Sequence, residues 1–496
     1  MQKRKFITGA LWLTVTGAAL RAVGMLYRVF ISGKLGEAGM GLYQLILSVY
    51  MLCSAFATAG VSIAVTRLVS HEQVSGGKRS IRAVMNFSLS WSITVALLIA
   101  VVLFTGANFI AATFLHSPAS APGLRILSLG LPFMAASAVF NGYFMARSRV
   151  WLSCAAQVAE QAVRITLVAF CIDRFAAISV EAGCNAVFMG NAASEFVAAA
   201  LLYCFYLSDL RSLPEGGEKK AVFSCFLPIQ FPIAVGKYIS SLLHTVENIL
   251  VPGRLEKFGG DRSQALADFG ALKGMALPLI MFPSSFLSSL AGLLIPELTA
   301  AATLRQQEKI KVLTGRTLQL TFWFSILMGG MFFRFAPQLG MLIYKSRDVG
   351  RILQSLAPVI PFMYLDCITD GLLKGIGEQF ASLRYSTTDS LMRIALVFLL
   401  LHRYGLTGFL VVMVISNASV ALLGLRRLLK VTEAKLPVLR GLLLPLTGVV
   451  LAHLLTMGLS SLLPAGILYL LIYLLFLLVT GALSLKEFAM FFKPQQ

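Results

Sequence analysis

The sequence carries little charge for its length and has none of the short motifs of common enzymes. Of its 496 residues only 13% are charged, 57% are hydrophobic, and the mean hydropathy is +0.81. A soluble globule of this size needs far more polar surface, so a soluble fold is excluded. No Walker A, HExxH or GxSxG pattern occurs, which excludes an ATPase motor. We therefore expect a protein that is not an enzyme.

Metal-ligating patterns and a basic domain for nucleic acid are also lacking. The 7 cysteines show no CxxC or Cys/His ligand spacing, so the sequence predicts neither disulfides nor a metal site. The net charge is +20, but no basic and aromatic patch stands on a soluble segment. We expect no nucleic-acid partner.

What the sequence does contain is a series of apolar runs of about 20 residues, each long enough to cross a bilayer. They predict an all-α integral membrane protein with about fourteen transmembrane helices. The approximate limits are 6–31, 41–69, 84–114, 123–145, 151–172, 183–207, 223–251, 266–298, 315–335, 354–373, 383–401, 406–425, 437–459 and 465–484. With the N-terminus inside, about 24 basic residues fall on the cytoplasmic side and about 10 outside. Both termini are therefore predicted to be cytoplasmic.

The chain repeats itself at an offset of 229 residues. Five residues of the first copy, Pro132, Gly142, Ser153, Glu160 and Arg164, recur as Pro361, Gly371, Ser382, Asp389 and Arg393. The repeat predicts two six-helix lobes in the same orientation, a construction typical of secondary transporters. The expected divisions are an N-lobe at 1–208, a cytoplasmic linker at 209–222, a C-lobe at 223–432, and two extra helices with a cytoplasmic tail at 433–496.

Five basic residues on the first, seventh and eighth spans are candidates for binding a substrate: Arg21, Arg28, Lys237, His244 and Lys273. Charge inside a membrane is costly, so such residues face a cavity or a partner. If the three spans face one another, their cavity is cationic and suits an anion such as phosphate or pyrophosphate. The alternatives are a structural ion pair for the two arginines and a neutral, hydrogen-bonded histidine.

Three acidic residues are candidates for coupling to a cation or proton. Asp366 and Asp370 lie one turn apart on the tenth span, and paired carboxylates hold Na⁺ or share a proton. Glu195 is the third candidate, on the sixth span. No cofactor is expected beyond such an ion.

The duplicated acids and arginines are interpreted as structural ion pairs. Glu160 precedes Arg164 by four residues, as Asp389 precedes Arg393, and this spacing brings the two side chains together on a helix.

Several segments resemble the stage V sporulation protein B family, in the polysaccharide-exporter branch of the superfamily that also holds the multidrug and toxin extrusion (MATE) transporters and the lipid II flippases. They are 24–31 (GMLYRVFI), 35–43 (LGEAGMGLY), 59–69 (AGVSIAVTRLV), 276–280 (ALPLI), 282–284 (FPS), 295–297 (IPE) and 370–377 (DGLLKGIG). Arg21 matches a first-helix arginine of the lipid II flippases. Their eighth-helix arginine has no equivalent, since Pro278 occupies that region and Lys273 lies more than a turn earlier.

The resemblance implies a flippase that moves an undecaprenyl-pyrophosphate-linked glycan, lipid II-like or another polysaccharide precursor, across the bacterial plasma membrane by alternating access. It implies roles in peptidoglycan or other cell-envelope synthesis, including sporulation, and envelope-synthesis enzymes as candidate partners. The alternative is a cation-coupled multidrug or organic-cation antiporter of the same fold, which the two aspartates on the tenth span favour and the cationic helices disfavour.

Overall fold

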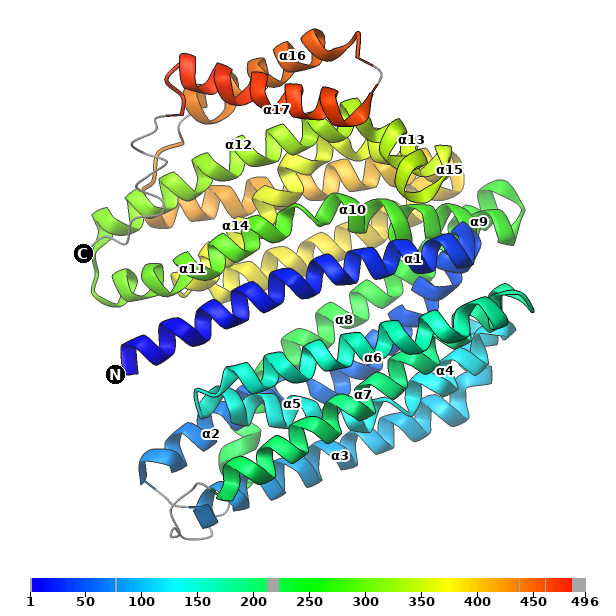
Figure 1. Cartoon of the computed structure of the whole chain (residues 1–496), viewed down its shortest axis with the longest axis vertical. Helices are drawn as coiled ribbons and strands as arrows, with labels where there is room; N and C mark the ends of the chain where they lie inside the picture. Colours follow the sequence, from blue (N-terminus) through cyan, green and yellow to red (C-terminus); the bar gives the residue numbers. More distant parts are fainter. Residues whose placement is uncertain (1, 76–77, 212–222, 437, 460, 484–496) are drawn as a thin grey trace. The chain divides into compact units, whose positions relative to one another are not determined.

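A computed structural model describes residues 2–75, 78–211, 223–436, 438–459 and 461–483, and within these ranges the regular structure is entirely helical (Figure 1). The chain divides into two compact units, Met1–Gly270 and Ala271–Gln496. This confirms the predicted all-α class.

The first unit contains nine α-helices and two short irregular turns among its described residues. They are α1 (Gln2–Thr58), α2 (Val61–Ser75), α3 (Lys78–Phe109), η1 (Ile110–Phe114), η2 (Pro118–Ser120), α4 (Ala121–Ser128), α5 (Leu131–Ala146), α6 (Val150–Ala176), α7 (Val180–Arg211), α8 (Phe223–Gly259) and α9 (Arg262–Phe269).

The second unit follows with a comparable series. It comprises η3 (Gly270–Ala276), α10 (Leu277–Met281), α11 (Ser284–Thr303), α12 (Gln307–Leu339), η4 (Gly340–Tyr344), α13 (Arg347–Leu356), η5 (Ala357–Val359), α14 (Ile360–Gly375), α15 (Gln379–Thr432), η6 (Val438–Leu443), α16 (Leu444–Thr456) and α17 (Leu462–Val479).

Two of the helices are too long for a single membrane crossing. Helix α1 has 57 residues and α15 has 54, and each contains one glycine with non-helical angles, Gly36 (φ 69°) and Gly405 (φ 55°). A positive φ is accessible to glycine, so each long helix is two spans joined at that residue. Eleven helices are long and apolar enough to cross a membrane, and a bent pair in residues 118–146 supplies a twelfth. Dividing α1 and α15 at their glycines gives the predicted fourteen spans of a multi-pass membrane protein.

The internal repeat reappears as the same order of local structures. Helices α3 and α12 both end in a π-helical turn, η1 or η4, and a residue with positive φ follows, His116 (φ 50°) or Lys345 (φ 55°). A short helix comes next, α4 or α13, and then α5 or α14 with Pro132 or Pro361 in its first turn. Proline suits a helix start because the missing N–H is not needed there. The duplication therefore includes the irregular turns as well as the spans.

Helix α8 packs within the first unit. The hydroxyl of Thr245 donates to the Ser48 carbonyl of α1 (3.0 Å), and the Tyr238 hydroxyl donates to the Phe56 carbonyl (3.3 Å). The sequence repeat assigned this span to the C-lobe at 223–432. The boundary between the two compact units therefore lies one span later than the boundary predicted from the sequence repeat. The predicted linker at 209–222 lies mostly outside the described residues.

A buried carboxylate joins three helices of the first unit at one end. Asp209 of α7, whose side chain is fully buried, accepts hydrogen bonds from the Tyr143 hydroxyl (2.6 Å) and from Nε of Arg147 (3.0 Å), and pairs with Arg149. A buried charge is tolerated when it is paired and hydrogen-bonded in this way. The ends of α5, α6 and α7 are thereby fixed to one another.

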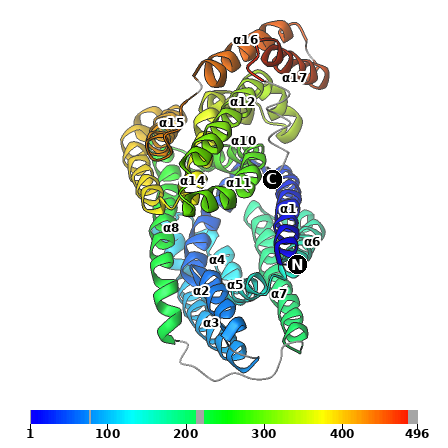
Figure 2. The same cartoon turned by 90° about the vertical axis from the view of Figure 1, so that its left-hand side faces the viewer.

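The last two helices form a hairpin against α12, and Figure 2 shows α16 and α17 side by side along it. Arg334 of α12 donates to the carbonyl groups of Thr456 (3.0 Å), Met457 (3.4 Å) and Leu459 (3.1 Å). Thr456 is the last residue of α16 and the other two lie just beyond it, where carbonyl groups lack partners in the following helical turn. Arg334 therefore holds the end of α16 on the second unit.

The predicted orientation has a direct test by cysteine labelling. In a variant without its native cysteines, a cysteine beside Gly76 should react with an impermeant reagent only after the membrane is opened. A cysteine at Gly259 should react in intact cells, since it lies between the predicted seventh and eighth spans. The reverse pattern would contradict the fourteen-span topology.

Candidate functional site

Four of the five predicted substrate-binding residues lie in the first unit. Arg21 of α1 is exposed and Arg28, seven residues later, is partly buried. On α8, Lys237 and His244 are exposed, and 57% of the His244 side chain is accessible. Three cationic or ionisable groups thus lie on the surface of long apolar helices, where a membrane protein keeps such groups only for a cavity, water or a headgroup.

Lys237 and His244, seven residues apart, form a polar stripe on α8 beside that helix's contact with α1. Tyr238 and Thr245 make the contact, and each follows one of the stripe residues, Lys237 and His244. Glu247, next to the stripe, is almost fully buried and lies 4.0 Å from the His244 ring. The stripe therefore faces outward from the helix pair while its neighbours anchor it.

The fifth residue, Lys273, lies in the π-helical segment η3 at the start of the second unit. It is partly buried, and its ammonium lies 5.7 Å from the centre of the Phe409 ring. A cation over an aromatic face is stabilised electrostatically. Short π-helical segments recur at functional sites, so the location of Lys273 agrees with a role in binding.

The duplicated pair of the first unit is the centre of a hydrogen-bonded cluster. Arg164 forms an ion pair with Glu160, donates to the side-chain oxygen of Gln161 (3.2 Å), and donates through Nε to the Ser194 hydroxyl of α7 (3.2 Å). The two charged side chains are only about one-fifth exposed, at 19% and 21%. The sequence predicted the pair and missed the serine, which has no counterpart at the repeat offset.

The second unit repeats the arrangement. Arg393 pairs with Asp389 (2.8 Å) and donates through Nε to the Ser416 hydroxyl (3.1 Å), and Ser416 in turn donates to Asp389. Ser416 comes from the second half of α15, as Ser194 comes from α7. Each cluster therefore ties the fifth or eleventh span to the next one.

A second acid accompanies each pair. Glu195 lies near Glu160 and Arg164, and Asp366 of α14 lies near Asp389 and Arg393. In the described part of the chain, neither Glu195 nor Asp366 has an ion-pair partner of its own. Each cluster thus sets two carboxylates against one guanidinium, and the excess negative charge suits a cation or a proton.

Asp370 is already engaged. One of its oxygens lies 2.5 Å from the Lys374 ammonium, and the other accepts a hydrogen bond from the Ser382 hydroxyl. Of the two aspartates predicted to act together, Asp366 is thus the one without a direct basic partner. Within the described ranges, no group of three or more His, Cys, Asp or Glu side chains has the geometry of a metal site.

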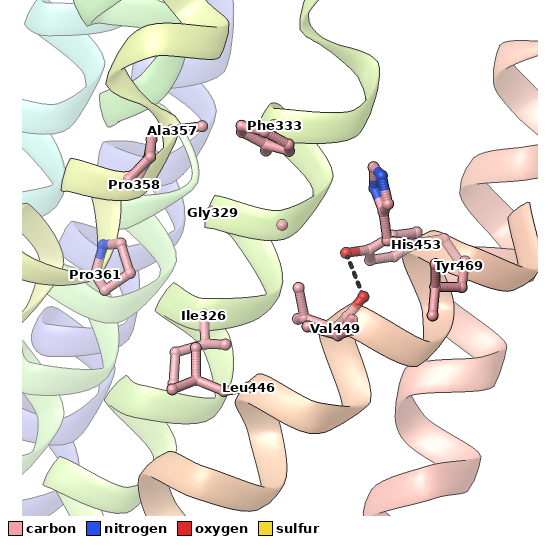
Figure 3. A pocket seen from close by; sticks show the side chains of 13 residues that line it. Ile326, Gly329, Phe333, Ala357, Pro358, Pro361, Leu446, Val449, His453 and Tyr469 are labelled. Atoms are coloured by element: carbon pink, nitrogen blue, oxygen red, sulfur yellow. Dashed lines mark hydrogen bonds between the residues drawn. The ribbon is translucent and has the colours of Figure 1, made fainter. Parts of the chain in front are cut away.

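An apolar cavity of about 390 Å³ lies in the second unit between α12, the start of α14 and α16 (Figure 3). It is lined by Ile326, Gly329, Gly330, Phe333, Ala357, Pro358, Pro361, Leu446, Val449, Val450, His453, Leu454 and Tyr469. The Tyr469 hydroxyl is satisfied by the Val449 carbonyl (3.3 Å), which leaves a wall suited to a hydrocarbon chain.

Comparison with known proteins gives consistent relatives. Stage V sporulation protein B of Bacillus subtilis is 26% identical over 438 residues, which cover 85% of this chain and 83% of that protein. The lipid II flippase MurJ of the same organism is 23% identical over 413 residues, covering 76% of this chain and 73% of MurJ.

Solved structures agree on the fold. An inward closed structure of the lipid II flippase MurJ matches with a TM-score of 0.74 at 14% identity, covering 95% of this chain and 98% of that one. An inward-facing multidrug resistance MATE transporter matches with a TM-score of 0.66 at 16% identity, covering 84% of this chain and 98% of that one.

At residues 6–302 the sequence matches the profile of a family described as polysaccharide biosynthesis protein. This is more than half of the chain, which therefore belongs to the polysaccharide biosynthesis protein family.

Proposed function

We propose that this protein flips an undecaprenyl-pyrophosphate-linked glycan across the bacterial plasma membrane by alternating access, with both termini in the cytoplasm. The observation that carries the proposal is the exposure of Arg21, Lys237 and His244 on apolar helices. The similarity to MurJ, a lipid II flippase, supports the same class of substrate.

The head group is the part of the substrate that these residues bind. A pyrophosphate presents several acceptor oxygens, and the planar guanidinium of Arg21 donates two parallel hydrogen bonds to such a group. Lys237 adds a point charge, and His244 adds a donor whose charge depends on pH. The glycan needs only a hydrated space beside them, which agrees with a transporter that performs no chemistry on its substrate.

The apolar cavity beside α16, in the second unit, offers a separate surface for a hydrocarbon chain such as an isoprenoid. Its aliphatic and proline walls bury hydrocarbon, and each buried methylene contributes about 0.8 kcal/mol.

The two acid clusters are proposed to couple transport to a cation gradient. Glu195 and Asp366, both partly buried, each add a carboxylate beside an existing ion pair, so binding of Na⁺ or a proton neutralises an uncompensated charge. A change in that charge alters how the helices carrying it pack, which links ion binding to a conformational equilibrium.

The second candidate function is a cation-coupled multidrug antiporter. The acids Glu195 and Asp366 favour it, as does the likeness in fold to a multidrug transporter. An organic cation would meet repulsion at Arg21 and Lys237, so this function is the weaker of the two.

A leaflet-accessibility assay tests the proposal. Purified protein is reconstituted into vesicles with a labelled undecaprenyl-pyrophosphate disaccharide, and an impermeant glycosidase reports how much label reaches the outer leaflet. We expect label to move with time in these vesicles and to stay in protein-free ones. Movement of an organic-cation dye with no movement of the lipid would support the antiporter instead.

A further inference from the structure

A second cavity, of about 540 Å³, opens at the first turns of α15 in the second unit. It is separate in lining from the apolar cavity beside α16. Its walls are Glu378, Phe380, Ala381, Leu383, Arg384, Thr387, Thr388 and Arg427. The predicted topology places these turns at the cytoplasmic surface of the membrane.

The cavity carries one uncompensated positive charge. Glu378 and Arg427 neutralise each other through a bidentate pair with contacts of 2.8 and 2.9 Å. Arg384 is exposed, has no acidic partner in the described part of the chain, and stacks on the Tyr385 ring at 5.3 Å. The hydroxyl groups of two threonines in the wall add donors for an anion.

The rim of the cavity is apolar. Phe380 is 89% exposed and Leu383 is 37% exposed, on a helix apolar enough to span a membrane. Large apolar side chains at this depth contact lipid rather than water. The ligand therefore combines an anionic group with hydrocarbon.

The internal repeat supplies a comparison within the same chain. At the offset of 229 residues, the positions of Phe380, Leu383, Arg384, Thr387 and Thr388 are occupied in α6 by Trp151, Cys154, Ala155, Val158 and Ala159. The aromatic residue recurs, as expected for an anchor at the membrane surface. The arginine and both threonines do not recur, so the fold of the repeat does not require them.

We propose that this cavity binds the headgroup of an anionic phospholipid of the cytoplasmic leaflet. The guanidinium of Arg384 donates to the phosphate, Thr387 and Thr388 donate to its remaining oxygens, and Phe380 and Leu383 contact the first part of the acyl chains. The negative surface of the cytoplasmic leaflet favours such binding. The proposal is independent of which substrate the protein transports.

The test is a lipid-binding titration with purified full-length protein in phosphatidylcholine nanodiscs, using native mass spectrometry to count bound phosphatidylglycerol. We expect the parent protein to retain phosphatidylglycerol over phosphatidylcholine. Arg384→Gln should lower its occupancy roughly five- to tenfold, because one charge-assisted contact is lost. Thr387→Val/Thr388→Val, which keeps the charge, should lower it less.

The matched control is Arg426→Gln, which removes the same charge from the last turns of α15, on the same predicted side of the membrane, but lies outside the cavity wall. Its occupancy should equal that of the parent. An equal loss of phosphatidylglycerol occupancy in Arg384→Gln and Arg426→Gln would mean that general surface charge attracts the lipid, and would contradict a specific site. Retention of the undecaprenyl-pyrophosphate lipid in place of phosphatidylglycerol would overturn it too, and would identify the cavity as part of the substrate path.

Discussion

Arg21→Ala is expected to abolish translocation of the pyrophosphate-linked lipid while the protein still reaches the membrane. Arg21 is exposed, so alanine should disturb the packing of the helix little. Two charge-assisted hydrogen bonds to a phosphate stabilise a complex by about 3 kcal/mol or more, equivalent to over a hundredfold in rate or affinity. Complementation of a depleted strain at equal expression measures the result, together with the leaflet-accessibility assay.

Arg21→Lys separates charge from geometry. Lysine retains the positive charge and loses the planar pair of donors, so we expect transport to fall roughly tenfold rather than to vanish. Lys237→Ala should weaken transport without changing which glycan is moved.

The control for this series is Arg67→Ala, which removes an exposed arginine of α2 that is not among the predicted binding residues. It should complement like the parent. Full complementation by Arg21→Ala would contradict a cationic binding surface. It would then favour the antiporter, in which Glu195 and Asp366 bind the coupling cation.

The span pattern was readable from the sequence because a bilayer imposes one length and one composition on each crossing. The joins between spans were harder to predict. Gly36 and Gly405 lie inside continuous helical hydrogen bonding on either side, so the structure runs two predicted spans together as one bent helix. The π-helical turns after α3 and α12 depend on the packing of the backbone against its neighbours. The periodicity of apolar residues does not predict them.

The candidate site was predictable where the interaction is local. Glu160 and Arg164 lie four residues apart on one helix, and spacing alone predicts their contact. Ser194, which completes the cluster, lies 30 residues away from Arg164 on another helix. Its contact depends on tertiary packing, and the serines of the two clusters fall at a different offset from the pairs. An alignment of the halves that allowed a gap would have found it.

The aspartates of the tenth span show a further limit of spacing. Asp366 and Asp370 lie one turn apart, which predicts that they act together. Lys374 lies at the same spacing beyond Asp370 and competes for it, and Ser382 from the next helix takes the remaining oxygen. Asp366 therefore lies near Asp370 and near the Asp389–Arg393 pair, and has no ion-pair partner of its own in the described part of the chain. The spacing of charged residues in the sequence does not determine which basic or polar group pairs with each aspartate.

The strongest effect on stability is expected from breaking the second cluster on one side only. Arg393→Leu leaves Asp389 and the nearby Asp366 without their guanidinium, in a site where the Asp389 side chain is only 15% exposed. Loss of one partner from a buried pair costs about 3–5 kcal/mol, whereas replacing both partners with apolar residues is often neutral. Asp389→Leu/Arg393→Leu should therefore give a higher folded yield and a higher thermal midpoint in detergent than Arg393→Leu.

The comparison of single and double variants also separates scaffold from mechanism. If Asp389 and Arg393 only stabilise the helix pair, the double variant should both fold and transport, because the Ser416 hydroxyl can then donate to a carbonyl of its own helix or to water. If it folds but does not transport, the pair takes part in ion coupling. Arg393→Leu with the parent's thermal midpoint would instead mean that water reaches the site and screens the charges.

The Glu160/Arg164 pair offers the same comparison in the first unit. A result shared by both units would follow from the duplication. A result limited to one unit would identify the unit in which ion binding is coupled to transport.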